Sequence, residues 1–501
     1  MSMANRKKES DRKMIMKKMI LNRRLIRIGL IGLSLYISTC DFTTAPESPN
    51  QPPNTTLANI PVDDDTLFAL VTLHWDGEDE DGYITGYQYR YITHHLQVGD
   101  SVVQEWKNID ETSLELSFES SDVLNYQKFQ VRSVDNLYEV DPTPAQKCFY
   151  TTQSVFPITE IVSPEANGKF FVIEQVTDWW QGIYLNITGK DKDGEITEYA
   201  WAVDSGEWHW SADTAIYIEP QNFDPLEGEH VIKVTSRDNT NLIDPVGDSV
   251  KVTLLKPSFS KNILIIDETN EKSFPFGVSA TDADVDSFYA EIFGTNESWD
   301  FAKQGMPSKE VLGQYRLIVW HSDNSYSSAS DYHKLPDHIS DIKDYMNVGG
   351  DFIMSGWRIL KSFAPSDAFP KTFTEGSFIH DYLHINVADE TPLSPDFIGA
   401  NGVGEVFDDI KVDSVKLASA FPYLGKLAQI NIMPERAGFT DVIYSYKNLN
   451  DSQYWSYRGK ACGLRYYGTS FDVVALGFPI YFIQKEDAKK LAVSLLNSMG
   501  Y

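Results

Sequence analysis

The chain has 501 residues, and 42% of them are hydrophobic, which is enough for several buried cores. The net charge is −29; because the first 39 residues carry ten basic and two acidic side chains, the rest of the chain carries −37. This acidity argues against binding to nucleic acid. Only Cys148 and Cys462 follow position 40, which is too few for a disulfide framework or a cysteine-based zinc site.

The first 40 residues have the pattern of an export signal. Basic residues between positions 6 and 24 precede an apolar run at 30–37, which is too short to span a bilayer. The run leads into Ser-Thr-Cys, an ending that resembles a bacterial lipobox, in which Cys40 is lipidated. We therefore expect a lipoprotein signal peptide (1–40), a Pro/Ser-rich tether (41–57) and a lipid anchor in the membrane of the cell envelope, at the outer membrane or cell surface. Plain secretion is the alternative.

An internal repeat follows the tether. GEDEDGYITGYQYRY (77–91) matches GKDKDGEITEYAWAV (189–203), and VRSVDNLYEVDP (131–142) matches VTSRDNTNLIDP (234–245). Alternating apolar and polar residues, with turn signals about every dozen positions, predict a β-sandwich in each copy, at 58–152 and 153–257. The order of elements resembles fibronectin type III or related immunoglobulin-like modules of bacterial surface proteins.

The acidic D-x-D-G element of the repeat has two interpretations. An EF-hand loop needs an oxygen ligand at position 1 and an acid at position 12, and both copies lack both. We expect a tight strand connection in which Gly82 and Gly194 take positive φ. The alternative is a calcium site, with these candidate ligands: Asp79, Asp81, Asp191 and Asp193.

Two tryptophans mark a candidate ligand surface on the second module. Trp208 and Trp210 are two positions apart, so both rings would lie on one face of a strand. Such a pair can stack on a sugar or a peptide. Packing at the edge of the sandwich is the ordinary alternative.

From residue 258 onward, buried runs alternate with helical patterns. We predict strands at 262–267, 315–320, 351–355, 460–468 and 472–483, and helices at 282–293, 335–350 and 485–499. This alternation predicts a flavodoxin-like α/β domain at 258–501, with a doubly wound and mostly parallel sheet. The expected architecture is therefore multidomain, with two β-sandwich modules followed by an α/β domain.

The stretches YRLIVWHSDN, IKDYMNVGGDFIMSGW and VVALGFPIYFI resemble the class I glutamine-amidotransferase-like superfamily, with trehalose-utilisation-like domains among its divergent members. Active amidotransferases of this superfamily carry a Cys nucleophile at a strand-to-helix elbow and a later His with Glu. Here the elbow at 354–357 has no Cys, and the last histidine is His384. The resemblance implies a disarmed elbow without amidotransferase activity. We expect Trp357 and Arg358 to project from this turn towards the crevice of the sheet and to hold a ligand there.

Polar residues follow the predicted buried strands at the carboxyl edge of the sheet, where α/β proteins bind ligands. The candidates for catalysis are Asp267, His321, Asp323 and Ser355. Helix capping by these residues is the structural alternative. We therefore hold two hypotheses: a non-catalytic binding or scaffold lipoprotein for an extracellular glycan, peptide or protein, or an extracellular glycan or ester hydrolase using Asp267, His321 and Asp323. Neither requires a cofactor other than the calcium considered above.

Overall fold

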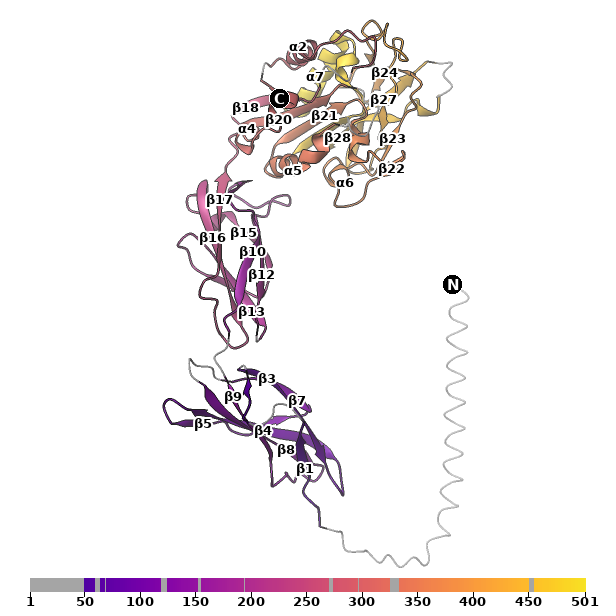
Figure 1. Ribbon diagram of the computed structural model, residues 1–501. Coiled ribbons are helices and arrows are strands. Elements are labelled where there is room, and N and C mark those ends of the chain that lie inside the picture. Colours follow the sequence, from indigo (N-terminus) through magenta and orange to yellow (C-terminus); the bar gives the residue numbers. More distant parts are fainter. Residues whose placement is uncertain are drawn as a thin grey trace, which may run out of the picture. The chain divides into compact units, whose positions relative to one another are not determined.

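The computed structural model describes residues 49–58, 64–67, 69–118, 124–151, 155–192, 194–269, 274–295, 297–324, 333–449 and 455–501 (Figure 1). The predicted signal peptide with Cys40, the first part of the tether and Asp193 lie outside these residues. The chain divides into two compact units: the first contains the first β-sandwich, and the second contains the second sandwich and a mixed sheet. Among the described residues, none of the helices combines the length and apolarity needed to cross a membrane.

The first unit is built from two sheets. The smaller has the order β1 (Asn54–Leu57), β3 (Leu70–Glu78), β7 (Ser113–Ser117). The larger has the order β2 (Thr66–Leu67), β9 (Ala145–Thr151), β8 (Asn125–Asp135), β4 (Ile84–His95), β5 (Ser101–Val103), and β6 (Lys107–Ile109) also pairs with β4. Alternate residues of β3 and β8 are buried, and the rings of Trp75 and Phe129 lie 5.9 Å apart between the sheets. The predicted β-sandwich is confirmed.

The tether is shorter than predicted. We expected it to extend to residue 57, but Asn54–Leu57 forms β1, antiparallel to β3. Thr55 is buried in the sandwich, and its backbone N–H donates to Asp141 Oδ2 at 2.8 Å. The Pro/Asn-rich composition concealed this short strand, because only one of its side chains needs to be buried.

The second sandwich repeats this plan in the second unit. One sheet has the order β10 (Ile158–Ser163), β12 (Ile183–Lys190), β15 (Ala215–Ile218). The other has the order β11 (Gly168–Phe171), β17 (Asp248–Leu255), β16 (Gly228–Asp238), β13 (Ile196–Val203), β14 (His209–Ser211). A short 3₁₀ helix, η1 (Pro220–Asn222), follows β15. Leu185 of β12 and Ile232 of β16 lie in the shared core, so the second β-sandwich is confirmed as well.

The rest of the second unit surrounds a nine-stranded sheet. Its order is β19 (Ser298–Asp300), β18 (Lys261–Asp267), β20 (Tyr315–Ser322), β21 (Asp351–Gly356), β29 (Asp472–Leu476), β28 (Ala461–Tyr467), β27 (Thr440–Asn448), β24 (Phe397–Gly402), β25 (Ile410–Lys411). The first four pairings are parallel and the last four antiparallel. The predicted mostly parallel sheet is therefore only half right. The connection 468–471 between β28 and β29 is too short for a parallel crossover, which needs a dozen residues or more.

Smaller elements complete this region. A three-stranded sheet has the order β22 (Lys371–Thr372), β23 (Val387–Glu390), β26 (Asn431–Ile432). The α-helices are α2 (Asp282–Phe293), α3 (Phe301–Gln304), α4 (Lys309–Leu312), α5 (Ile339–Asn347), α6 (Phe378–Asp381) and α7 (Lys485–Ser498). The 3₁₀ helices are η4 (Leu335–His338), η5 (Ile359–Phe363), η6 (Trp455–Tyr457) and η7 (Ile480–Phe482).

Helices cover both faces of the nine-stranded sheet. Leu317 and Val319 of β20 share one core with α2 and α7, whereas Ile318 and Trp320 share the other with α5. Successive residues of a strand point to opposite faces, so the continuous apolar run of β20 supplies both cores. Gly349 has a φ of 103°, a conformation that favours glycine, and α5 ends at Asn347 just before it.

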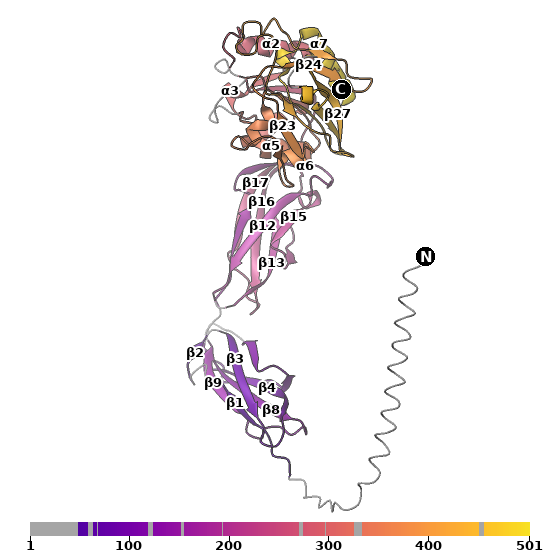
Figure 2. The same ribbon diagram turned by 90° about the vertical axis from the view of Figure 1, so that its right-hand side faces the viewer.

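The second sandwich packs directly against the nine-stranded sheet region. Phe171 and Val172 belong to the same buried cluster as α5. The ring of Trp179 lies 5.1 Å from Tyr382 and 4.7 Å from Phe471. In both views α5 lies at the end of the second sandwich near β17 (Figures 1 and 2). A shared core implies that the two parts of this unit hold a fixed geometry.

Candidate functional site

The structure brings together the polar residues predicted at the sheet edge. Asp267, His321 and Ser355 occupy paired positions on β18, β20 and β21. His321 Nδ1 lies 2.9 Å from Asp323 Oδ2 and 3.4 Å from Asp267 Oδ1. The parallel strands end at one edge, which explains why residues 54 and 88 positions apart in sequence meet there.

The side chains of this cluster are buried and bonded to other protein groups, as in a network that supports the fold. His321, Asp323 and Ser355 are fully buried, and Asp267 is 1% exposed. The Ser355 hydroxyl donates to the carbonyl of Phe478 at 3.3 Å, so it is not hydrogen-bonded to a base that could activate it. In the part of the chain that the structure describes, these side chains are enclosed, which argues against direct contact with a large substrate.

Neighbouring residues hold the network in place. The His321 ring stacks on Tyr289 of α2, with centroids 3.5 Å apart. Asp323 Oδ1 accepts from the Tyr481 backbone N–H at 3.1 Å and from the Tyr289 hydroxyl at 3.3 Å. These contacts tie the end of β20 to α2 and to η7.

Burial shifts the protonation of this network. Burial raises the pKa of Asp267 to about 7, against the opposing charge of His321. Burial by itself would lower the pKa of His321, but the charges of Asp267 and Asp323 outweigh it, and the pKa of His321 is raised. The network therefore retains protons near neutral pH.

The structure buries Trp357 and pairs Arg358 with Glu390, at the two positions where the sequence predicted ligand contacts. β21 continues through Gly356, and Trp357 is fully buried, with its Nε1–H donating to the Ala428 carbonyl at 2.9 Å. Arg358 has a φ of 61°, and its Nε and Nη2 donate to the two carboxylate oxygens of Glu390 at 2.9 and 3.1 Å. The Trp357 indole therefore lies in the core, and the Arg358 guanidinium is held by Glu390. The positive-φ residue of the elbow is thus Arg358 and not a nucleophile.

The first acidic turn is held by protein hydrogen bonds. Asp81 Oδ2 accepts from the Gln51 backbone N–H at 3.1 Å, and Asp79 Oδ1 accepts from the Asp81 backbone N–H at 3.3 Å. Gly82 does not have the predicted positive φ. A Cβ there would lie 2.1 Å from Asn136 Oδ1, so a larger residue would displace the side chain that accepts from the Tyr83 backbone N–H.

The second acidic turn has the same construction. A Cβ on Gly194 would lie 2.4 Å from Asn239 Oδ1 and 2.7 Å from Asp191 Oδ2. Asn239 Oδ1 also accepts from the Glu195 backbone N–H at 3.4 Å. The shared Asp-Asn pair of the repeat therefore supports the turn, and the calcium alternative at these aspartates stays a prediction.

The predicted Trp208 and Trp210 surface lines a pocket of about 730 Å³. Trp208 is 46% exposed. The Arg237 guanidinium lies 4.3 Å from the centre of the Trp210 ring, so one face of that indole is already covered. Only Trp208 offers a substantially free ring.

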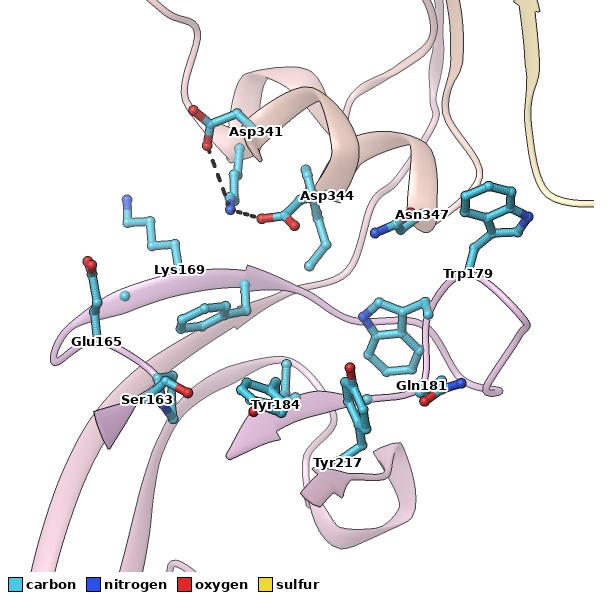
Figure 3. Close-up of a pocket in the computed structure, with 18 of the residues that line it drawn as sticks. Ser163, Glu165, Lys169, Trp179, Gln181, Tyr184, Tyr217, Asp341, Asp344 and Asn347 are labelled. Carbon is cyan, nitrogen blue, oxygen red and sulfur yellow. Dashed lines mark hydrogen bonds and ion pairs between the residues drawn. The ribbon is translucent and has the colours of Figure 1, made fainter. Parts of the chain in front are cut away.

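A second pocket lies against the other sheet of this sandwich, and we call it the aromatic cleft (Figure 3). It has a volume of about 740 Å³. Tyr184 of β12 and Tyr217 of β15 are paired in register, with ring centroids 5.3 Å apart. They are 42% and 49% exposed, since both take the outward positions of strands whose neighbouring residues enter the core. The cleft therefore has an aromatic wall open to solvent.

The opposite wall of the aromatic cleft is polar. Figure 3 shows Asp341, Asp344 and Asn347 along α5 on one side of the cleft and Tyr184 and Tyr217 on the other, with the strand that carries Lys169 between them. The Lys309 ammonium forms ion pairs with both Asp341 and Asp344. Asn347 Oδ1 accepts from the Tyr382 hydroxyl at 2.8 Å. This wall offers hydrogen-bond acceptors and donors in fixed positions.

Trp179 closes one end of the aromatic cleft (Figure 3). Its loop is fixed because the Thr177 hydroxyl oxygen accepts from the backbone N–H groups of Trp179 and Trp180 at 3.2 and 2.9 Å. Tyr382 and Phe471 pack against its ring. The cleft is thus preorganised by both parts of the unit.

Tyr184 and Tyr217 were missed from the sequence. The signal was present: each tyrosine stands at an outward position in a short alternating strand, IYLNI and AIYI. Which of the many outward aromatic residues adjoin α5 depends on the docking of the sandwich, and no local pattern encodes that docking.

No family model and no curated protein matches this chain. Solved structures that match include fibronectin(III)-like modules of Clostridium thermocellum CbhA, at 14% identity over 40% of this chain and 95% of that one, with a TM-score of 0.18. A 1.5-MDa bacterial ice-binding adhesin matches at 10% identity over 44% of this chain and 73% of that one, with a TM-score of 0.18. The FN1–FN3 domains of chicken CNTN1 match at 14% identity over 42% and 68%, with a TM-score of 0.16. The β-sandwich assignment rests on this chain's own sheets and their packing.

Proposed function

We propose that this chain is a non-catalytic glycan-binding protein of the bacterial cell envelope. The observation that carries the proposal is the aromatic cleft, whose lining combines two exposed tyrosines with carboxylates and an amide of α5. A preformed concave site with aromatic surface and a few fixed polar groups is the usual form of a small-ligand site.

The chemistry of the cleft fits a sugar better than a peptide. A pyranose ring presents C–H groups that stack on aromatic faces, as Tyr184 and Tyr217 offer, and hydroxyls that bond to carboxylates and amides. Asp341 and Asp344 supply acceptors, and Lys309 between them offsets part of their charge. A basic peptide would need unpaired acids, and Lys309 already engages both.

In this proposal, the remaining parts of the chain anchor the protein and hold the aromatic cleft away from the membrane. The leader and Cys40 would anchor the protein in the membrane, and the first sandwich would act as a spacer. Residues 258–501 would be a degenerate amidotransferase-like α/β domain that supplies the polar wall of the cleft. The hydrolase alternative is not favoured, because His321, Asp323 and Ser355 are sealed from solvent.

A glycan array probed with the purified full chain tests the proposal. Tyr184→Ala and Tyr217→Ala should each lose most of the retention, whereas Tyr83→Ala should retain it, since Tyr83 is a still more exposed tyrosine (67%) in the first sandwich. If Trp208→Ala loses retention and the two tyrosine variants keep it, the glycan binds in the pocket lined by Trp208 and Trp210 instead. Binding to basic peptides instead of glycans would refute the ligand class.

A further inference from the structure

Three carboxylates meet at the carboxyl end of β18, beside the first turns of α2. Asp267 ends β18, and Asp282 and Asp286 are four residues apart on α2, so the helix places them on one side. One oxygen from each of the three lies within 4.8 Å of the other two. That spacing matches oxygen atoms arranged around a single cation with bonds of about 2.0–2.6 Å.

Asp267 supplies a separate indication of a ligand. Its Oδ1 accepts from the Thr269 backbone N–H at 2.7 Å and lies 3.4 Å from His321 Nδ1. Its Oδ2 is enclosed, in a residue that is 1% exposed, and has no hydrogen-bond donor among the residues that the structure describes. A buried carboxylate oxygen without a donor costs about 1–3 kcal/mol or more, so native structures seldom leave one without an ion or water.

Asp282 shows the same feature in part. Lys303 Nζ lies 2.9 Å from Asp282 Oδ2, while Asp282 Oδ1 is enclosed and has no donor within the described part of the chain. Two oxygens without donors therefore belong to the same group of three carboxylates. Lys303 is 70% exposed, and a single ammonium at the surface does not neutralise them.

Other acids increase the local negative charge. Asp300 is the register partner of Asp267 on β19, and Asp323 lies on the far side of His321. Burial and the charge of Asp282 raise the pKa of Asp286. Among the described residues, the cations near these acids are His321, Lys303 and Lys416, which are fewer than the acids, and a divalent ion would supply positive charge.

We propose that Asp267, Asp282 and Asp286 bind one hard divalent cation, Mg²⁺ or Ca²⁺, which fixes the end of β18 to α2. Carboxylate oxygens without sulfur or imidazole ligands select these ions over zinc or copper. Asp286 also lines a surface hollow of about 430 Å³ with Glu291 and Ser298. Of the three carboxylates, Asp286 lines this hollow, so an ion held by the group would lie near water that could complete its coordination. The proposal is independent of glycan binding, because none of the three lines the aromatic cleft.

Titration of the purified full chain with Mn²⁺, followed by electron paramagnetic resonance, tests this site. Mn²⁺ prefers the same ligands and reports the number of bound ions directly. Competition with Mg²⁺ and with Ca²⁺ then identifies the ion that binds more tightly. The variants are Asp267→Asn and Asp286→Asn, and Asp81→Asn in the first sandwich is the control for binding at the acidic turns.

The proposal predicts that Asp267→Asn and Asp286→Asn each lose one bound Mn²⁺ or weaken it at least tenfold, while Asp81→Asn keeps it. Asp286 is half-buried, so Asp286→Asn should fold and in chelator should unfold at a temperature equal to or above that of the wild type. The absence of Mn²⁺ binding in the wild type would overturn the proposal. So would binding that both substitutions leave unchanged.

Discussion

The substitution Asp267→Asn tests whether burial controls the protonation of the network of Asp267 and His321. The quantity measured is the free energy of unfolding as a function of pH. In chelator-treated protein, burial raises the pKa of Asp267 to about 7, compared with about 3.9 in an unfolded chain. A carboxyl group with a raised folded pKa contributes stability that is complete below about pH 4 and is lost as pH rises through about 7. Three units of pKa correspond to an upper limit of about 4 kcal/mol. The pKa of His321 is also raised, so the histidine changes stability in the same direction.

The assay is hydrogen exchange of peptides from β18 and β20 between pH 4 and 8, corrected for the intrinsic exchange rate. As pH rises from 4 to 7, the wild type should lose stability relative to Asp267→Asn, by up to about 4 kcal/mol. Asp286 and His321 both interact with Asp267, so the substitution also changes their titration, and about 4 kcal/mol is an upper limit. A difference that is independent of pH, or one that favours the wild type as pH rises, would refute the burial argument.

Three further predictions concern other buried or interfacial groups. Burial raises the pKa of the Cys462 thiol, so maleimide should label Cys462 only after denaturation; labelling of the native protein would contradict its place in the core. Trp357→Ala should lower the free energy of unfolding of the second unit by about 3–5 kcal/mol, measured by urea unfolding. An unchanged midpoint urea concentration would contradict the burial of Trp357. Trp179→Ala removes two aromatic contacts that together contribute about 1–3 kcal/mol. Hydrogen exchange in residues 172–182 should therefore be faster in this variant. Exchange at the wild-type rate would show that Trp179 does not stabilise this loop.

Much of the second unit's sheet was predictable from the sequence. The continuous apolar runs of β18 and β20 and the periodicity of α2 are local signals, and the predicted helix at 282–293 has the observed bounds. β24 was missed because its sequence, FIGANG, is rich in small residues and has no clear alternation. The parallel and antiparallel halves follow from connection lengths, which become visible only once every strand is known.

The candidate sites were harder to predict, because burial is a property of the whole fold. Trp357 follows a strand at the ligand edge, but the chain around Tyr423 and Ala428 covers it. His321 and Ser355 do meet as expected from their strand ends, yet α2 and η7 seal them. The positions that stay exposed, Tyr184 and Tyr217, look like ordinary outward residues in sequence.

The most direct test of the central claim is the affinity of the full chain for the glycan that the array retains best, measured by isothermal titration in chelator. The account predicts that Tyr184→Ala and Tyr217→Ala each weaken binding about tenfold or more, equivalent to about 1.4 kcal/mol, without changing the unfolding midpoint. Unchanged affinity in both variants would show that the aromatic cleft is not the glycan site.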